Sequence, residues 1–395
     1  MNNDWQYKGP FENEQDFFKW LTSLRRWIHQ HAELSYQEFQ TAGFVRQRLD
    51  ELGISQVEMV GETGIKAVID GKDSKLPKAA LRADMDALPI EEGTGLSFSS
   101  INRGVMHACG HDGHTAMLLG AIYLLQQDQQ PPADIVCMFQ PAEEHGNGAK
   151  MMVENGVLEG VGAVFGGHLD PHFATGQITV DEGIICAFAD QFQIKVKGRG
   201  GHAARPHESI DALVAASALV GNLQSLVSRE VDPNHAAVIT IGSFHAGTAP
   251  NVIAEEAVLD GTVRTTDIAT RERVLGGLKR MVDSAASMYG VKTELIMIDA
   301  LPAVINTKPA ADIARQAALK VAGPDGVISQ GKSSLGGEDF AFYQQQVSGC
   351  MVRYGAALPG AGVAHSNTFD FDEQALLIGA KWLAAAARLY LGGLR

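Results

Sequence analysis

The ten-residue stretch VMHACGHDGH, residues 105–114, places a thiol and an imidazole on either side of a single glycine. Cys109 and His111 can therefore converge on one cation with little side chain between them. Thiolate and imidazole suit Zn²⁺, and imidazole with carboxylate also accepts Mn²⁺, Co²⁺ or Ni²⁺. A Cys-x-His pair alone is more often a core cysteine beside a capping histidine, so the metal interpretation depends on further ligand-type residues.

The sequence around this stretch alternates between strand-like and helix-like patterns. It predicts a helix over residues 115–126 and strands over residues 65–69, 79–83, 134–139 and 163–165. Polar residues come directly after these strands, which is where open α/β folds keep their chemistry. The sequence therefore predicts an α/β domain with these ligand-type or acidic residues at strand ends: Asp86, Glu143, Glu144 and His168.

A second pattern occupies the middle of the chain. Strands are predicted at residues 191–196, 237–243, 256–264 and 292–298, and helices at 209–226 and 269–288. The order β-α-β-β-α-β is that of a ferredoxin-like domain. The predicted organisation is an α/β catalytic domain, residues 1–187 and 300–395, with an inserted ferredoxin-like lid or dimerisation domain at 188–299.

Composition excludes several classes of function. The 395 residues exceed what one core usually holds, and 32 Lys and Arg against 46 Asp and Glu give a net charge of −14. This charge argues against a nucleic acid or an anionic membrane as partner. The apolar runs fall short of a transmembrane helix, and the first residues lack a signal-peptide profile. The cysteines have no disulfide-like spacing, which predicts a cytoplasmic protein: Cys109, Cys137, Cys186 and Cys350.

Histidines and carboxylates elsewhere supply the further ligands. With His365, the strand-end residues give five metal-type ligands and one spare carboxylate, which suits two divalent ions roughly 3.5–4 Å apart. Adjacent carboxylates on an extended segment cannot both point the same way, so one of Glu143 and Glu144 can bind metal while the other meets solvent. A solvated acidic corner is the alternative. His29 and His31 could also chelate, although such a pair more often forms hydrogen bonds in a turn.

Four motifs together resemble one family. They are CGHDGH (109–114), QPAEE (140–144), GRGGHAARPH (198–207) and GEDF (337–340). The likeness, over residues 25–370, is to the metal-dependent amidohydrolases that include hippurate hydrolases, N-acyl-amino-acid deacylases and plant auxin-conjugate hydrolases. It implies that Glu143 is the general base, that Asp86 is a supporting acid, that His29 is not a ligand, and that two ions are held by Cys109, His111, Glu144, His168 and His365.

The same resemblance implies a mechanism and an assembly. Bound metal activates a water and polarises the amide carbonyl, and Glu143 passes the water's proton to the leaving amine. His202 and Asn251 supply the donors for the oxyanion. In relatives the lid histidine reaches the neighbouring subunit's site, which implies a homodimer or homotetramer. Arg264 could pair with the α-carboxylate of an N-acyl amino acid, or be an exposed arginine at a strand edge.

Two departures and three alternatives remain. The family's His-Pro-Glu-Leu is HAEL at 31–34, and LDPH at 169–172 has an acid where relatives usually have an apolar residue, which bears on the choice of substrate.

Dipeptidase or carboxypeptidase activity is an alternative within the family. An NAD-dependent dehydrogenase would use the G-x-G-x-x-A at 198–203, but no acid lies near the required position at 215–222. An inactive binding relative would lack a ligand or the base, and none is missing.

Overall fold

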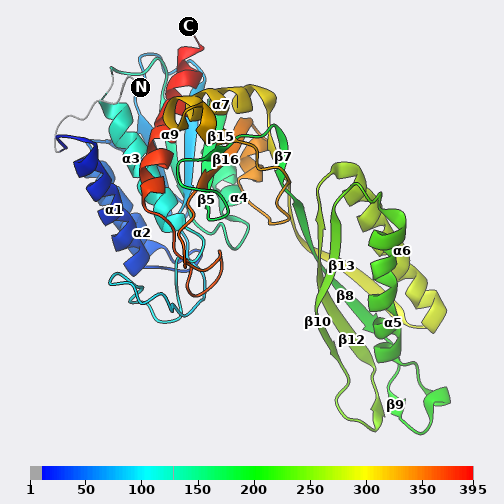
Figure 1. Ribbon diagram of the computed structural model, residues 1–395. Coiled ribbons are helices and arrows are strands. Elements are labelled where there is room, and N and C mark those ends of the chain that lie inside the picture. Colours follow the sequence, from blue (N-terminus) through cyan, green and yellow to red (C-terminus); the bar gives the residue numbers. More distant parts are fainter. Residues whose placement is uncertain (1–10, 128, 395) are drawn as a thin grey trace. The chain divides into compact units, whose positions relative to one another are not determined.

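Residues 11–127 and 129–394 are described by the computed structural model, in which the chain forms two compact units (Figure 1). The first unit comprises residues 1–183, 305–332 and 339–395, and the second comprises residues 184–304 and 333–338. The short segment 333–338 thus belongs to the second unit, although the sequence prediction placed all of residues 300–395 in the first domain.

The first unit is built on an eight-stranded sheet of order β1-β2-β4-β3-β5-β16-β6-β15. The four strands β4, β3, β5 and β16 are parallel to one another. Strand β2 pairs antiparallel with both β1 and β4, and β6 pairs antiparallel with β16. The bounds are β1 (Gln56–Val60), β2 (Gly64–Ile69), β3 (Lys78–Asp84), β4 (Ile135–Gln140), β5 (Val161–Asp170), β6 (Ile178–Thr179), β15 (Val327–Ile328) and β16 (Ser348–Gly355). Strands β3 and β4 are almost wholly buried, as expected for parallel strands covered on both faces.

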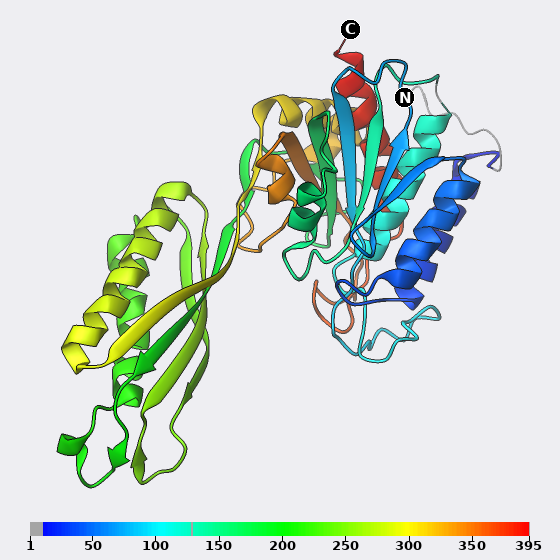
Figure 2. The ribbon, with the colours of Figure 1, turned by 180° about the vertical axis from the view of Figure 1, so that it is seen from behind.

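Helices cover both faces of this sheet. On one face α3 packs against α1 and α9, and α9 packs against α7; α3 and α9 lie on the same side of the sheet in Figures 1 and 2. The short helices α4 and α8 contact each other and, respectively, β4 and β16. The helices are α1 (Glu14–Gln30), α2 (Phe39–Glu51), α3 (His111–Gln126), α4 (Gly148–Glu154), α7 (Lys308–Ala322), α8 (Ala341–Gln344) and α9 (Gln374–Gly392), with a 3₁₀ turn η3 (Pro324–Gly326).

Helix α9 corrects one expectation. By length and composition it could cross a membrane, with a mean hydropathy of 1.3 over an 18-residue window, whereas the sequence prediction found no such run. In the fold, 72% of that window is buried. Its apolar residues pack against α3 and α7, so α9 is a core helix of the first unit.

The second unit has the predicted β-α-β-β-α-β order. Its antiparallel sheet, of order β10-β12-β8-β13, packs its apolar face against α5 and α6. The elements are β8 (Phe188–Lys197), α5 (Ala212–Ser225), β10 (Ala237–Ala246), β12 (Glu256–Thr265), α6 (Ile268–Tyr289) and β13 (Lys292–Leu301). A two-residue ladder joins β9 (Gly201–His202) to β11 (Val252–Ile253). The remaining elements are η1 (Pro206–Glu208), a π-helical turn η2 (Leu226–Glu230), and the paired strands β7 (Gly183–Cys186) and β14 (Val304–Asn306).

Two predicted boundaries were wrong, and both bear on the site. Strand β5 does not end near residue 165 but continues through His168, because β16 pairs with it as far as Asp170. Gly167 permits this pairing, since a Cβ there would lie 2.4 Å from the Tyr354 ring. Helix α3 begins at His111, four residues earlier than predicted, because Gly110 adopts the left-handed conformation (φ 90°) that turns the chain into the helix.

Candidate metal centre

His111 presents a buried nitrogen that has no protein partner. Its Nδ1 donates to the backbone oxygen of Asp86 at 2.9 Å, which leaves the lone pair on Nε2. Among the described residues Nε2 has no hydrogen-bond partner, although Asp84 Oδ2 lies 3.6 Å and Glu143 Oε2 3.9 Å away. Although burial opposes this, the Asp84 carboxylate raises the pKa of His111 well above its usual value. The surrounding carboxylates thus favour positive charge at this place, and a metal ion bound at Nε2 would supply it.

Cys109 and His168 face each other across the ends of two elements. Sγ of Cys109 lies 3.3 Å from Nε2 of His168, whose Nδ1 donates to the Leu169 oxygen at 2.6 Å. Burial raises the pKa of the Cys109 thiol to about 12, and burial also holds the pKa of His168 well below its usual value. His168 is therefore neutral, the form that binds metals, and a cation at this place is what would turn the thiol into a thiolate.

The two adjacent acids lie in a turn directly after β4. The N–H groups of Glu143 and Glu144 donate to the two carboxylate oxygens of Asp86, at 3.1 and 3.0 Å. Oε1 of Glu144 is buried, has no hydrogen-bond partner in the described parts of the chain, and lies 3.3 Å from His365 Nε2. The Asp86 carboxylate thus supports the turn by binding two of its peptide N–H groups.

His365 is placed by an unusual backbone. It has a positive φ of 66°, and its N–H donates to the Ala108 oxygen at 2.7 Å. The ligand-type atoms then form three groups, each within 4.8 Å: Cys109 with His111 and His168; Cys109 with Glu144 and His365; and His111 with Glu143 and Glu144. The structure therefore gathers all six sequence-predicted ligand and base residues of the first unit, and Cys109 is common to two groups.

His114 belongs to the support of this centre. It lies within ligand distance of His111 and Asp84, but both its nitrogens are used. Nδ1 donates to Asp84 Oδ1 at 2.6 Å, and Nε2 accepts from the Leu169 N–H at 2.8 Å. Arg82 binds the other oxygen of Asp84 at 2.6 Å. The Arg82 guanidinium helps to hold the pKa of Asp84 well below its usual value although burial opposes this.

His29 is not a ligand. Its Nδ1 lies 2.8 Å from Asp112 Oδ2 and its Nε2 lies 3.2 Å from Glu92 Oε1. Although burial lowers it, the bonds to Asp112 and Glu92 raise the pKa of His29 to about 9. Arg25 binds the same Asp112 oxygen at 2.8 Å. This buried network holds the first turn of α3, to which Asp112 belongs. His31 Nδ1 donates to the Trp27 backbone oxygen at 2.7 Å, one turn earlier in α1.

The second unit carries the other three predicted residues. His202 and Asn251 are exposed and lie together, because His202 pairs with Val252 and the Ala203 N–H donates to the Asn251 oxygen at 3.1 Å. Arg264 is half-buried at the C-terminal end of β12, whereas Asn251 precedes the N-terminal end of that strand. Its Nη1 lies 3.0 Å from where a Cβ on Gly337 would be. Burial lowers the pKa of Arg264 from its usual value, and Asp190 opposes this. Arg264 is thus separated within the second unit from the other two.

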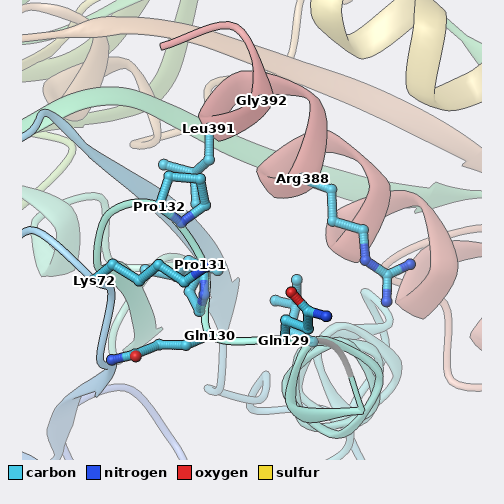
Figure 3. Close-up of a pocket in the computed structure, with 10 residues that line it drawn as sticks. Lys72, Gln129, Gln130, Pro131, Pro132, Arg388, Leu391 and Gly392 are labelled. Carbon is cyan, nitrogen blue, oxygen red and sulfur yellow. The ribbon is translucent and has the colours of Figure 1, made fainter. Parts of the chain in front are cut away.

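A hollow elsewhere on the first unit is separate from this centre. It has a volume of about 210 Å³ and lies between the Pro131–Pro132 loop and the end of α9, with Lys72 and Arg388 at its rim (Figure 3). None of its lining residues is one of the ligand-type residues described above.

Sequence reasoning missed several supporting side chains. Asp84, Ser35 and Glu38 were not singled out, yet Ser35 Oγ donates to Asp86 Oδ2 at 2.7 Å and Glu38 accepts from the Ala142 N–H at 2.9 Å. The available signal was the acid that ends a buried strand, at Asp84. For Glu38 there was no local signal, since its partner lies 104 residues away.

Comparison with known proteins decides the family. The model of peptidase family M20/M25/M40 matches residues 80–389. The chain belongs to this family. The resemblance drawn from the four motifs is confirmed, and the dehydrogenase alternative is excluded. A member of the M20/M25/M40 family is a hydrolase, and a centre of one thiol, three imidazoles and a carboxylate beside a second carboxylate suits its metal chemistry.

Similar proteins cover nearly the whole chain. An N-acetylcysteine deacetylase of Bacillus subtilis is 39% identical over 96% of this chain and 98% of its own length. An IAA-amino acid hydrolase of Arabidopsis thaliana is 37% identical over 95% and 88%. Thermostable carboxypeptidase 1 of Saccharolobus solfataricus is 38% identical over 91% and 93%.

Solved M20 structures share the two-domain fold. An aminohydrolase from methicillin-resistant Staphylococcus aureus superposes with a TM-score of 0.88 at 37% identity, covering 96% of this chain and 98% of its own. A dinuclear metal binding peptidase of Bacillus subtilis, from the M20 family, gives 0.84 at 36% identity, covering 96% and 99%. The predicted fold class, an α/β domain with an inserted ferredoxin-like domain, is confirmed.

Proposed function

We propose that this protein hydrolyses the amide bond of N-acyl-L-amino acids, giving a carboxylic acid and a free amino acid. The observation that carries the proposal is the pair of ligand groups that share Cys109, with the carboxylate of Glu143 beside them. Two divalent ions, Zn²⁺ or Mn²⁺ with Co²⁺ or Ni²⁺ also acceptable, would be held by Cys109, His111, Glu144, His168 and His365.

When bound, such ions would supply Lewis acidity for activating water and polarising the amide carbonyl. Glu143 is the general base. Its carboxylate lies 3.9 Å from the free nitrogen of His111, and its backbone is fixed by Asp86. A carboxylate in this position can accept the proton of the attacking water and then donate it to the leaving amine. Asp86 contributes by orienting the turn and the His111 ring.

The second unit is proposed to supply the remaining interactions. His202 and Asn251 both carry hydrogen-bond donors, are exposed, and lie close together. Their side chains are therefore available to donate hydrogen bonds to a developing oxyanion. We assign His202 to the site of a partner subunit in a homodimer or homotetramer, with the second unit, approximately residues 188–299, as the lid. Arg264 is half-buried near the end of β12. Its proposed role is to bind the α-carboxylate of the substrate. The four cysteines form no disulfide among the described residues, which suits a cytoplasmic location.

The substrate class rests on the relatives and is tested by a panel. Metal-reconstituted protein is offered N-acetyl, benzoyl and indole-acyl amino acids, with dipeptides and peptides bearing a free carboxyl terminus beside them. We expect faster hydrolysis of the N-acyl amino acids. Preference for peptides would favour carboxypeptidase action, the activity named for the Saccharolobus relative, and hydrolysis of neither class would overturn the proposal.

A further inference from the structure

We propose that Glu38 is a positioning residue for the catalytic turn, residues 142–144, and this inference rests on the proposed roles of Glu143 and Glu144. Glu38 precedes α2 but makes no side-chain bond to the helix end, where a carboxylate would ordinarily cap. Its fully buried carboxylate instead accepts from the Tyr36 N–H at 3.0 Å, the Ala142 N–H at 2.9 Å and the Thr63 hydroxyl at 2.7 Å.

Ala142 is the part of the turn that needs such support. It is fully buried and has a positive φ of 52°, in the left-handed region that a residue with a Cβ adopts only under strain. Strain of this kind persists only where the surrounding contacts over-determine the backbone, and it gathers at functional sites. Here the Ala142 N–H is bound by Glu38, and its oxygen accepts from the Gly148 N–H at 3.2 Å.

Two buried carboxylates therefore bind three successive peptide N–H groups. Glu38 takes that of Ala142, and Asp86 takes those of Glu143 and Glu144. Ser35, which lies just before Glu38 in the sequence, also binds Asp86: its hydroxyl donates to Asp86 Oδ2. Because the direction of each peptide plane sets where the next side chain points, these bonds direct the base and its neighbouring ligand towards the ligand cluster. Glu38 acts through the backbone and touches none of the reacting atoms.

Replacing Glu38 by alanine leaves the Ala142 and Tyr36 N–H groups and the Thr63 hydroxyl without their acceptor. The strained turn is then free to relax, and a displacement of about 1 Å at a catalytic group can cost on the order of 10²-fold in rate. We expect Glu38→Ala to lower kcat by roughly that factor with little change in KM. Glu38→Gln should stay close to wild type, because its amide oxygen can accept both N–H groups and its NH₂ can donate to the Thr63 oxygen.

Glu33 offers a matched control in the same segment. Its carboxylate also binds backbone and hydroxyl donors, those of Gln40 and Thr41, but none in the catalytic turn. Glu33→Ala should lose stability as Glu38→Ala does while keeping kcat within about threefold of wild type. A second variant separates strain from stability: adding Ala142→Gly to Glu38→Ala should recover on the order of tenfold in kcat, since glycine adopts this φ without strain.

The experiment measures kcat, KM, metal content and amide hydrogen exchange of a peptide spanning residues 140–148 in these variants. If wild type hydrolyses no N-acyl amino acid, the proposed function fails, and positioning is then judged from the exchange data alone. Faster exchange in that peptide for Glu38→Ala but not for Glu33→Ala supports positioning. Unchanged exchange in folded Glu38→Ala overturns it. So does wild-type kcat in folded, metal-loaded Glu38→Ala, or an equal fall in kcat for Glu33→Ala.

Discussion

The ligand cluster of the first unit and the exposed pair of the second unit are built in different ways. In the first unit, His111 and His168 each have one nitrogen fixed by a backbone oxygen, and the acidic turn is fixed by Asp86. In the second unit, His202 and Asn251 are exposed, and what holds them is mainly the short β9–β11 ladder. The candidate ligands are therefore held in place by the fold itself, whereas the proposed oxyanion donors act only when they are brought to a substrate.

Removal of metal tests the ligand cluster of the first unit, and it should have the largest effect on activity. Chelation should abolish hydrolysis completely, and added divalent ions should restore it, because the ions supply the activation of water. Cys109→Ala should bind fewer ions than wild type, as Cys109 is shared by two ligand groups. Elemental analysis alongside the assay checks both statements. Full activity in protein shown to be free of metal would contradict them.

The two adjacent acids should separate chemistry from ion binding. Glu143→Ala should lose roughly 10²–10⁴-fold in kcat through loss of the general base, while both ions stay bound. Glu144→Ala should lose metal as well, because its carboxylate lies within 4.8 Å of the ligand atoms of Cys109 and His365. Metal stoichiometry and kcat measured on the same samples decide the case. Exchanged behaviour of the two variants would mean that their roles are reversed.

The second half of the comparison is tested at His202. His202→Ala should lose about 10²–10³-fold in kcat, the cost of one oxyanion donor, with both ions retained. If His202 serves a partner's site, a dimer of one His202→Ala and one Glu143→Ala subunit has one site with both lesions and one intact site. Refolding the two variants together with metal should then recover a sizeable share of activity. No recovery, with mixed dimers confirmed by mass spectrometry, would refute the shared site.

Local patterns allowed the sequence to predict much of this molecule. Strand-end acids and the Cys-x-His stretch lie close in sequence to the elements that carry them, so local patterns identified the candidate ligands. Only the family resemblance assigned which of them bind the two ions and which one is the base. The prediction of where β5 ends was wrong because the last residues of β5 are strand only through their pairing with β16, nearly 200 residues later. Glu38 and Ser35 were missed for a related reason. Their partners are distant in sequence, and a buried glutamate has no periodicity of its own.

A substitution at Arg271 should lower the stability of the second unit without changing ion binding in the first unit, and its effect should be smaller than those above. Buried Asp190 is bound by both Nε and Nη2 of Arg271, at 2.8 and 2.6 Å. Arg271→Ala should lower the free energy of unfolding by about 2–3 kcal/mol, since Asp190 loses a charged partner, with some relief because Arg271 is partly exposed. Ion content of the folded protein should not change. Loss of ions with unfolding would show that the two units are not independent. Lys279→Ala, which breaks only an exposed pair, is the control.

The smallest expected effect is on the pH dependence of stability. Burial raises the pKa of Glu38 to about 6, above its ordinary value of 4.5. The folded state therefore holds this proton more tightly than the unfolded chain, and the contribution to stability falls as pH rises from about 4.5 to about 6. Relative to wild type, Glu38→Gln should gain at most about 2 kcal/mol over that interval and then remain level. Denaturant titrations at several pH values, at constant metal, check this. A constant difference would contradict it.

Helix α9 has a consequence for the order in which the chain folds during synthesis. Every other helix and strand precedes it in this sequence, yet it packs against α3, α7, β3 and β5. The first unit therefore cannot close its core until residue 392 has left the ribosome, whereas residues 184–304 already contain the whole four-stranded sheet of the second unit with its helices. Proteolysis of ribosome-bound chains ending near residue 340 should show the inserted unit protected and its host still open. A stalled chain of that length exposes the apolar face of α3 to chaperones.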